Sequence, residues 1–351
     1  MLHKARQSAV GAALAGSLLS LSPSAGAQTT LTMSSWVPPS HHLTQVVLEG
    51  FAEEVAKASA GRVTFEMLPK HPVAAAATFD AVRDGLVDVS FITASYTPGR
   101  LLLPLVAEFP GAGQTAEITS VAYNRLHWRY LHDAGEYKGV HLLAVFTHGP
   151  GQLFNTRRPI ERLADLEGMK LRTGGSVAEA VARALGASVV VNPVNPNART
   201  DNRELLNAGL ADGVLFPQDA IVSFGLAGVV KYATLFPGGL FNFAFGFVIN
   251  QDKWDKLAKQ DQELLTRFGG EFFARRAGTS WDNADRLGNE GMKKAGVRFD
   301  TANQTFIKDV QVKAQPIIEN WINEVKEKRN MDGAMLLREF HDELKRVAAG
   351  E

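Results

Sequence analysis

Segments with the spacing of a helix and segments with the spacing of a strand alternate along the first two thirds of this chain. Residues 42–59 carry apolar side chains at helical intervals, and residues 62–68 then change to an alternation of period two. The same order, helix before strand, returns at 79–86 with 87–93 and at 116–134 with 140–147. Strands separated by helices form βαβ units, which build largely parallel sheets. The chain is therefore predicted to be an α/β protein.

The pattern restarts after residue 151 and becomes wholly helical from residue 252. Strands are predicted at 152–156, 169–173, 188–191, 213–216 and 240–250, with helices at 177–185 and 203–208. Further helices are predicted at 252–259, 261–295, 306–328 and 333–348. The helix at 261–295 would measure roughly 50 Å at about 1.5 Å per residue. Such a helix is long enough to span two lobes.

Two lobes are expected, because the mature chain of about 320 residues exceeds what one hydrophobic core usually supports. Glycine and proline cluster at residues 149–151 and 237–239, and these breaks are predicted to be crossings between the lobes. Each lobe should hold a mixed, mostly parallel sheet flanked by helices. We expect lobe I at 28–149 plus about 241–285, lobe II at 150–240 plus about 286–330, and a C-terminal helix at about 331–351.

The N-terminus has the three-part pattern of a secretory signal peptide. Lys4 and Arg6 precede an apolar run at residues 9–21, and the small residues 25–27 precede Gln28. The apolar run is about a dozen residues long, short of the roughly 20 that a spanning helix needs. Cleavage after Ala27 and export to the periplasm are predicted. The chain has no cysteine, so neither disulfides nor a lipid-modified cysteine can follow export.

Charge and motifs argue against several classes of function. Cleavage at that site would leave 35 basic residues against 37 acidic residues, so no strong field attracts nucleic acid. The sequence contains no P-loop, G-x-S-x-G, complete G-x-G-x-x-G or H-E-x-x-H motif. No cofactor or metal is therefore expected. No catalytic nucleophile, no pair of carboxylates placed for acid/base catalysis and no set of metal ligands is visible in the sequence. This absence favours binding over catalysis.

One arginine stands at the mouth of a predicted helix. Residues 169–173 read as a strand containing Arg172, Gly174 and Gly175 as a turn, and Ser176 with Glu179 as a capping box that opens the next helix. A guanidinium fork and a helix N-terminus would then converge on one anionic ligand. The segment suggests a carboxylate site. The alternative is that Arg172 is an ordinary strand arginine paired on the surface.

Several motifs in register resemble the DctP-type solute-binding proteins of TRAP transporters. The matching segments are SSWVPPSHH (34–42), GRVTFEMLP (61–69), FDAVRDGLVDVSF (79–91), YTPGR (96–100), LADLEGMKLRTGG (163–175), LADGVLFPQDA (210–220) and PGGLFNFAFGFVINQDKW (237–254). The resemblance covers roughly residues 30–300 and implies a two-lobed periplasmic binding protein fold. In that family the receptor closes around a small organic acid and delivers it to a membrane permease driven by a sodium gradient. It implies that Arg172 forms a bidentate salt bridge with the ligand carboxylate.

Two departures from the family pattern bear on the ligand. Some relatives that bind diacids or sugar acids carry a second arginine at the position of Gln152, and an asparagine of the family is replaced here by Phe216. Both changes argue against a second carboxylate and for an apolar or aromatic ligand body. The expected ligand is a monocarboxylate such as a 2-oxo or 2-hydroxy acid with a hydrophobic substituent. Arg203 is either a second anion contact or a solvated helix residue, and the solvated alternative is favoured.

Further ligand contacts follow only from the register of the resemblance. Candidate contacts are Trp36, His41, Tyr96, Gln218, Phe241 and Phe245. For each phenylalanine the alternative is core packing, which accounts for most phenylalanines in any fold. Trp281 and Asp282 also match the family pattern, and a structural role is expected for both.

Three classes of function remain open at this point. The favoured one is a transport receptor for a TRAP permease, expected to be a monomer. A C4-dicarboxylate receptor would be a variant of it with another ligand. A periplasmic sensing module for a signalling receptor would share the binding reaction and differ in its partner. An exported enzyme acting on carboxylates is the least supported, since no catalytic set is visible.

Overall fold

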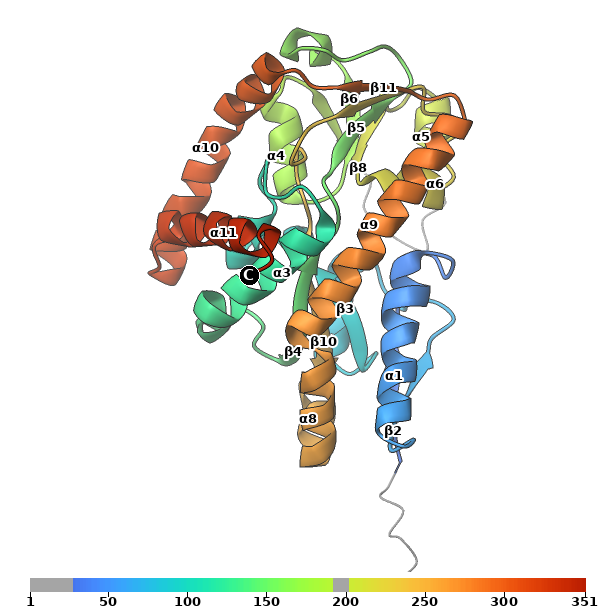
Figure 1. Ribbon diagram of the computed structural model, residues 1–351, viewed down its shortest axis with the longest axis vertical. Coiled ribbons are helices and arrows are strands. Elements are labelled where there is room, and N and C mark those ends of the chain that lie inside the picture. Colours follow the sequence, from blue (N-terminus) through green and yellow to red (C-terminus); the bar gives the residue numbers. More distant parts are fainter. Residues whose placement is uncertain (1–27, 192–201) are drawn as a thin grey trace, which may run out of the picture.

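The computed structural model describes residues 28–191 and 202–351, which form two lobes, each built on a mixed sheet (Figure 1). The predicted signal peptide, residues 1–27, lies outside the described residues. The first sheet has the strand order β2-β1-β3-β10-β4. Its strands are β1 (Thr29–Met33), β2 (Val63–Met67), β3 (Val89–Thr93), β4 (Val140–Thr147) and β10 (Ala244–Asn250). Strands β1, β2 and β3 pair in parallel, whereas β10 is antiparallel to both β3 and β4.

The second sheet has the strand order β11-β9-β5-β8-β6-β7. Its strands are β5 (Gln152–Asn155), β6 (Lys170–Thr173), β7 (Ser188–Val191), β8 (Gly213–Phe216), β9 (Tyr232–Leu235) and β11 (Arg298–Thr301). Strand β5 is antiparallel to β8 and β9, and the remaining pairs are parallel. In each sheet the antiparallel member is thus the strand that enters directly from the other lobe.

The two crossings between the sheets run side by side as hydrogen-bonded backbone. The Gly151 N–H donates to the Phe241 carbonyl at 2.8 Å, and the Leu240 N–H donates to the Gly151 carbonyl at 2.8 Å. A Cβ on Gly151 would lie 2.3 Å from the Phe241 ring, so the close approach requires glycine. This pairing explains why β10 begins at Ala244 and not at residue 240 as predicted. The residue limits of the lobes themselves stay a prediction.

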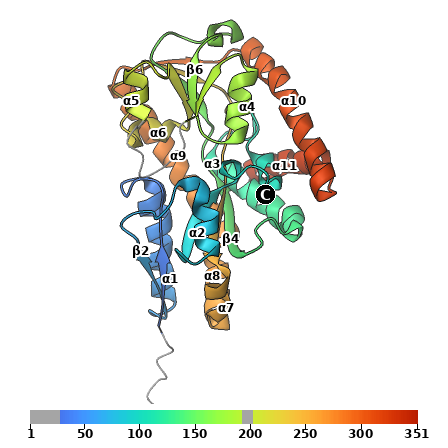
Figure 2. The same cartoon turned by 180° about the vertical axis from the view of Figure 1, so that it is seen from behind.

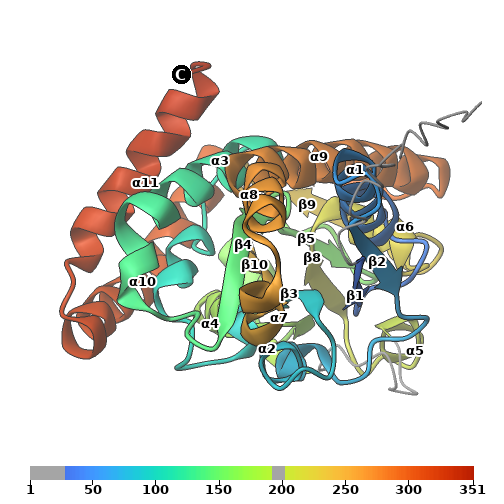
Figure 3. The same cartoon turned by 90° about the horizontal axis from the view of Figure 1, so that it is seen from below.

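Helices cover both faces of each sheet. The first lobe contains α1 (Gly50–Ala58), α2 (Thr78–Arg83), α3 (Ala116–Leu126), α7 (Gln251–Lys256) and α8 (Lys259–Phe268). Helix α1 directly follows a π-helix at Leu43–Glu49. The second lobe contains α4 (Ser176–Ala184), α5 (Asn202–Asn207) and α6 (Gln218–Ser223). Helices α3 and α9 (Gly270–Lys294) pack on one side of the first sheet, and α2 packs on the other (Figure 3).

Helix α9 spans the lobes, packing on α3 in the first and on α6 in the second (Figure 1). The single helix predicted at 261–295 is wrong, because α8 and α9 meet at a break. A Cβ on Gly269 would lie 2.5 Å from the Leu143 carbonyl oxygen, and Gly270 has a φ of +51°. Further along, Gly278 and Gly288 let the backbone of α9 touch the backbone of both lobes.

The C-terminal helices also join the two lobes. Helix α10 (Gln304–Arg329) packs on α4 of the second lobe, and α11 (Gly333–Ala348) returns to pack on α3 of the first (Figure 2). The indole N–H of Trp321 donates to the Leu102 carbonyl at 2.8 Å. Both helices bury large apolar side chains in the hydrophobic core, so α10 and α11 are an integral part of the fold.

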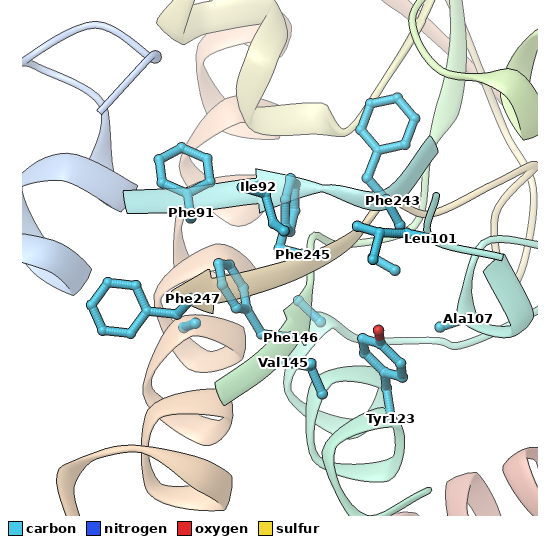
Figure 4. Packing of buried hydrophobic residues seen from close by; sticks show 14 of the residues in the cluster. Phe91, Ile92, Leu101, Ala107, Tyr123, Val145, Phe146, Phe243, Phe245 and Phe247 are labelled. Carbon is cyan, nitrogen blue, oxygen red and sulfur yellow. The ribbon is translucent and has the colours of Figure 1, made fainter. Parts of the chain in front are cut away.

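A row of phenylalanines connects the core of the first lobe to the crossing. Figure 4 shows the side chain of Phe245 between those of Phe91 and Phe243. The Phe245 ring lies 6.0 Å from that of Phe91 and 6.5 Å from that of Phe243, measured between centroids. Phe247 stacks on Phe273 of α9 at 4.3 Å. The aromatic core therefore extends from the interior of lobe I to the space between the lobes.

Candidate ligand-binding site

Strand β6 buries Arg172 at the junction of the two lobes. The residue is 2% exposed, and its guanidinium carbon lies 4.7 Å from the centre of the Phe216 ring on the neighbouring strand β8. Burial lowers the pKa of Arg172, but an arginine remains protonated at neutral pH. A ring face stabilises a desolvated cation. The alternative that Arg172 is a surface arginine is wrong.

The turn after Arg172 starts helix α4 without the predicted capping box. Helix α4 already includes Ser176 as its first residue, and no side chain caps it at Gly175. Gly175 has a φ of +85°, and a Cβ there would lie 2.4 Å from Ser95 Oγ of the first lobe. The packing of the lobes against this glycine, and not local sequence, sets the helix start. Glu179 is therefore not used by a cap and lies in the wall of a cavity.

Tyr96 and Arg172 approach the same turn from opposite lobes. A Cβ on Gly174 would lie 3.4 Å from the Tyr96 hydroxyl and 3.8 Å from Nη1 of Arg172. Burial raises the pKa of Tyr96 to about 12, so its hydroxyl keeps its proton at neutral pH. A cation and a neutral hydroxyl donor thus lie together. That pair suits the two oxygens of one carboxylate.

Two cavities meet at Tyr96. One has a volume of about 260 Å³ and lies along the Gly174 turn, with Ser95, Thr173 and Ser176 in its wall. The other is enclosed by rings from both lobes, from the crossing and from α9, and its free space is about 50 Å³. The second cavity is lined by Trp36, Val37, His41, Tyr96, His148, Phe216, Pro217, Asp219, Ala220, Phe224, Phe243, Phe245 and Trp281. This free space is smaller than an aromatic acid, so the walls must move apart to admit one.

Five of the predicted contacts lie in this aromatic wall: Trp36, His41, Tyr96, Phe216 and Phe245. The other predicted residues do not line it. Gln152 is held by the backbone of Phe236, which donates to its Oε1 at 2.7 Å and accepts from its Nε2 at 3.2 Å. Phe241 packs behind the wall on His148 and Gly151, and Gln218 begins α6 against α9. Arg203 is exposed on α5.

A buried polar cluster joins the lobes at one end of the aromatic cavity. His41 Nδ1 accepts the Leu43 N–H at 3.1 Å, so the ring proton is on Nε2, which lies 3.1 Å from Asp219 Oδ2. The Trp281 indole N–H donates to Asp219 Oδ1 at 3.1 Å. The Asp219 N–H donates to Oδ1 of Asp285 at 2.8 Å. These contacts connect the loop that carries His41 to helices α6 and α9.

Protonation in this cluster follows from burial and charge. Burial, then the neighbouring His41, lowers the pKa of His42 to about 3, so His42 is neutral. Burial, then the negative Asp219, raises the pKa of Asp285 well above its usual value, which favours its protonated form. Within the described residues, His41, His42 and Asp219 have ligand atoms close enough for a metal ion.

Several cavity residues were missed or given another role from sequence, and three of them are Trp281, Phe243 and His148. Trp281 was expected to be structural, yet its ring lines the cavity while stacking on Phe245 at 5.4 Å. Asp282 does have the expected structural role, since it accepts from the backbone N–H groups that begin α3. Phe243 lies between Phe241 and Phe245 and could have been found from the period-two pattern. His148 was missed, although it directly precedes the first crossing.

This chain is similar to a family of bacterial solute-binding proteins and to several of its solved structures. The model of bacterial extracellular solute-binding protein family 7, DctP, matches residues 33–324. A TRAP periplasmic solute-binding protein of Bordetella bronchiseptica, solved with bound (R)-mandelate and (S)-mandelate, is 39% identical with a TM-score of 0.85. That match covers 91% of this chain and 99% of the other.

Two further proteins extend the comparison. A marine metagenome TRAP solute-binding protein specific for aromatic acid ligands, in complex with 3-hydroxybenzoate, is 27% identical with a TM-score of 0.82, covering 91% of this chain and 99% of its own. The outer membrane transporter protein TsaT of Comamonas testosteroni is 26% identical over 84% of this chain and 86% of its own length. Along the described part of this chain, no helix combines the length and apolar character that crossing a membrane requires. The family match spans both sheets and the cavities between them, and the chain belongs to the DctP family of bacterial extracellular solute-binding proteins, the receptors of TRAP transporters.

Proposed function

We propose that this receptor captures an aromatic monocarboxylate, such as a 2-hydroxy or 2-oxo acid, and delivers it to the membrane subunits of a TRAP-type transporter. The observation that carries the proposal is the buried Arg172 guanidinium, 4.7 Å from the Phe216 ring at the edge of an aromatic cavity. The relatives solved with mandelate and with 3-hydroxybenzoate support the same ligand class.

Charge selects a single carboxylate. Among the described residues, Arg172 is the only buried lysine or arginine. A second carboxylate would enter a wall of rings, where an ion without a partner costs several kcal/mol by order of magnitude. We therefore favour a monocarboxylate over a C4-dicarboxylate. The ring of the ligand would pack edge-to-face or offset against Phe243, Phe245 and Trp281.

The roles of the remaining residues follow from this arrangement. Arg172 and Tyr96 bind the carboxylate, while Trp36, His41, Phe216 and Phe245 contact the ligand body. Gln152, Phe241 and Gln218 support the site from behind. We further propose that the receptor is a periplasmic monomer, cleaved after Ala27, whose lobes have the limits expected from the sequence.

A thermal-shift and calorimetric comparison of organic acids tests the ligand class. Mandelate, benzoate and 3-hydroxybenzoate are expected to stabilise the protein, whereas succinate and glucuronate are not. A ligand at 100 times its dissociation constant should add about 2.7 kcal/mol to the free energy of unfolding. Tighter binding of succinate than of every aromatic acid would contradict the proposal. Loss of uptake on deleting neighbouring permease genes separates transport from a sensing role.

A further inference from the structure

His148 presents a hydrogen-bond acceptor to the aromatic cavity. The residue is 1% exposed at the end of β4, and its ring lies 5.0 Å from Phe243 and 5.9 Å from Trp281, measured between centroids. Its Nδ1 is hydrogen-bonded to the Gly149 carbonyl oxygen. A carbonyl only accepts, so Nδ1 carries the ring proton. In the neutral ring, Nε2 then holds a lone pair.

The ring is neutral under physiological conditions. Burial lowers the pKa of His148 to about 4, although the Gly149 carbonyl and the charge of Asp219 act in the opposite direction. Nε2 is therefore an acceptor and not a donor at neutral pH. No described residue hydrogen-bonds to it, even though it is fully buried. A buried acceptor of this kind favours a guest that supplies the missing donor.

Most of the other polar groups in the cavity wall have partners, although Asp219 Oδ2 is also buried without a hydrogen bond. The Trp36 indole donates to the Phe91 carbonyl at 3.2 Å. Trp281 and His41 both engage Asp219. The Tyr96 hydroxyl lies on the side of the Gly174 turn, near the guanidinium. Within the described wall, His148 Nε2 is thus a neutral buried acceptor without a hydrogen-bond partner.

We propose that His148 Nε2 accepts a hydrogen bond from a hydroxyl group of the bound aromatic acid and so selects hydroxy acids over 2-oxo and unsubstituted acids. The inference rests on the proposed function, because it assumes an aromatic carboxylate in this cavity. A 2-oxo group offers only lone pairs and would face the lone pair of Nε2. The donor can be a 2-hydroxyl, as in mandelate, or a ring hydroxyl, as in 3-hydroxyphenylacetate.

Calorimetric titration with four probes measures the selection. We expect mandelate or 3-hydroxyphenylacetate to bind at least about tenfold more tightly than phenylacetate and phenylglyoxylate, because a site built around a hydroxyl leaves its acceptor unpaired without one. Whichever hydroxy acid gains identifies the position of the donor. Equal affinities for all four acids would overturn the inference while leaving the proposed function standing. Absence of binding by all four would reject the proposed function and the inference with it.

Two substitutions at His148 separate the acceptor from packing. In His148→Asn the amide nitrogen can still donate to the Gly149 carbonyl, but nothing replaces Nε2, so the preference for the hydroxy acid should fall below threefold. In His148→Gln the longer amide places an oxygen near Nε2, so part of the preference should return. Phe243→Leu is the control, since it trims the same wall and should weaken both acids equally. A hydroxy-acid preference retained in His148→Asn would overturn the inference.

Discussion

Replacing Arg172 with lysine isolates the planar fork from the charge. Arg172 is 2% exposed, and its guanidinium packs on the Phe216 ring. A hydrogen bond to a charged group contributes about 1.5–3 kcal/mol, and a guanidinium makes two such bonds to one carboxylate. Lysine keeps one of them, so Arg172→Lys should weaken mandelate binding roughly 10- to 150-fold. Arg172→Met removes both, which predicts a loss of about 3–6 kcal/mol, or roughly 150- to 20,000-fold.

Isothermal titration calorimetry measures these losses, and chemical denaturation checks the fold. Methionine fills much of the space of the arginine stem and buries no charge, so Arg172→Met should leave the unfolding free energy unchanged or higher. Arg203→Met is the matched control, because Arg203 is exposed on α5 and should not affect affinity. Binding by Arg172→Lys within threefold of the wild type would refute the reasoning. An equal loss in Arg203→Met would refute it as well.

Three further substitutions test the surroundings of the site. Burial raises the pKa of Glu108 from 4.5 to about 8, so the folded state retains a proton that the unfolded chain releases. The contribution of this group to the free energy of unfolding is complete below pH 4.5 and falls by about 1.4 kcal/mol per pH unit up to pH 8. Denaturation at pH 5.5 and 7.5 should show that Glu108→Gln lacks this slope, and parallel curves would contradict it. Burial acts to raise the pKa of Asp219, but the hydrogen bond and the charge of His41 lower it overall. Stability from this carboxylate is therefore lost as pH falls through its folded pKa. Asp219→Asn should lose less stability than the wild type between pH 5 and 3, and an equal loss would count against the role of the cluster. Gln152→Arg should lower the unfolding free energy by roughly 2–4 kcal/mol in urea, since it breaks two bonds to Phe236 and buries a charge, and it should not create succinate binding.

Local sequence patterns predicted the limits of several elements. Strands β4, β7 and β8 and helix α11 have the predicted limits. Strands β1, β9 and β11 were not predicted, and each has only four or five residues, too few to show a clear alternation. Such strands form through pairing with neighbours distant in the sequence, which no local window records. The helix α6 was not predicted either, because it has only six residues, although it carries Asp219.

The carboxylate-binding arginine could be predicted from sequence because it lies in a single motif. The other features of the site depend on contacts between residues that are distant in the sequence. Gln152 matched a ligand position, but its amide bonds to Phe236, 84 residues away. Ser176 and Glu179 matched a capping box, yet Gly175 packed on Ser95 fixes the helix start. The role of His148 is visible only when the Gly149 carbonyl fixes its tautomer. Sequence therefore locates the charge that attracts an acid, while the packing of the crossing determines which acid completes the hydrogen bonds.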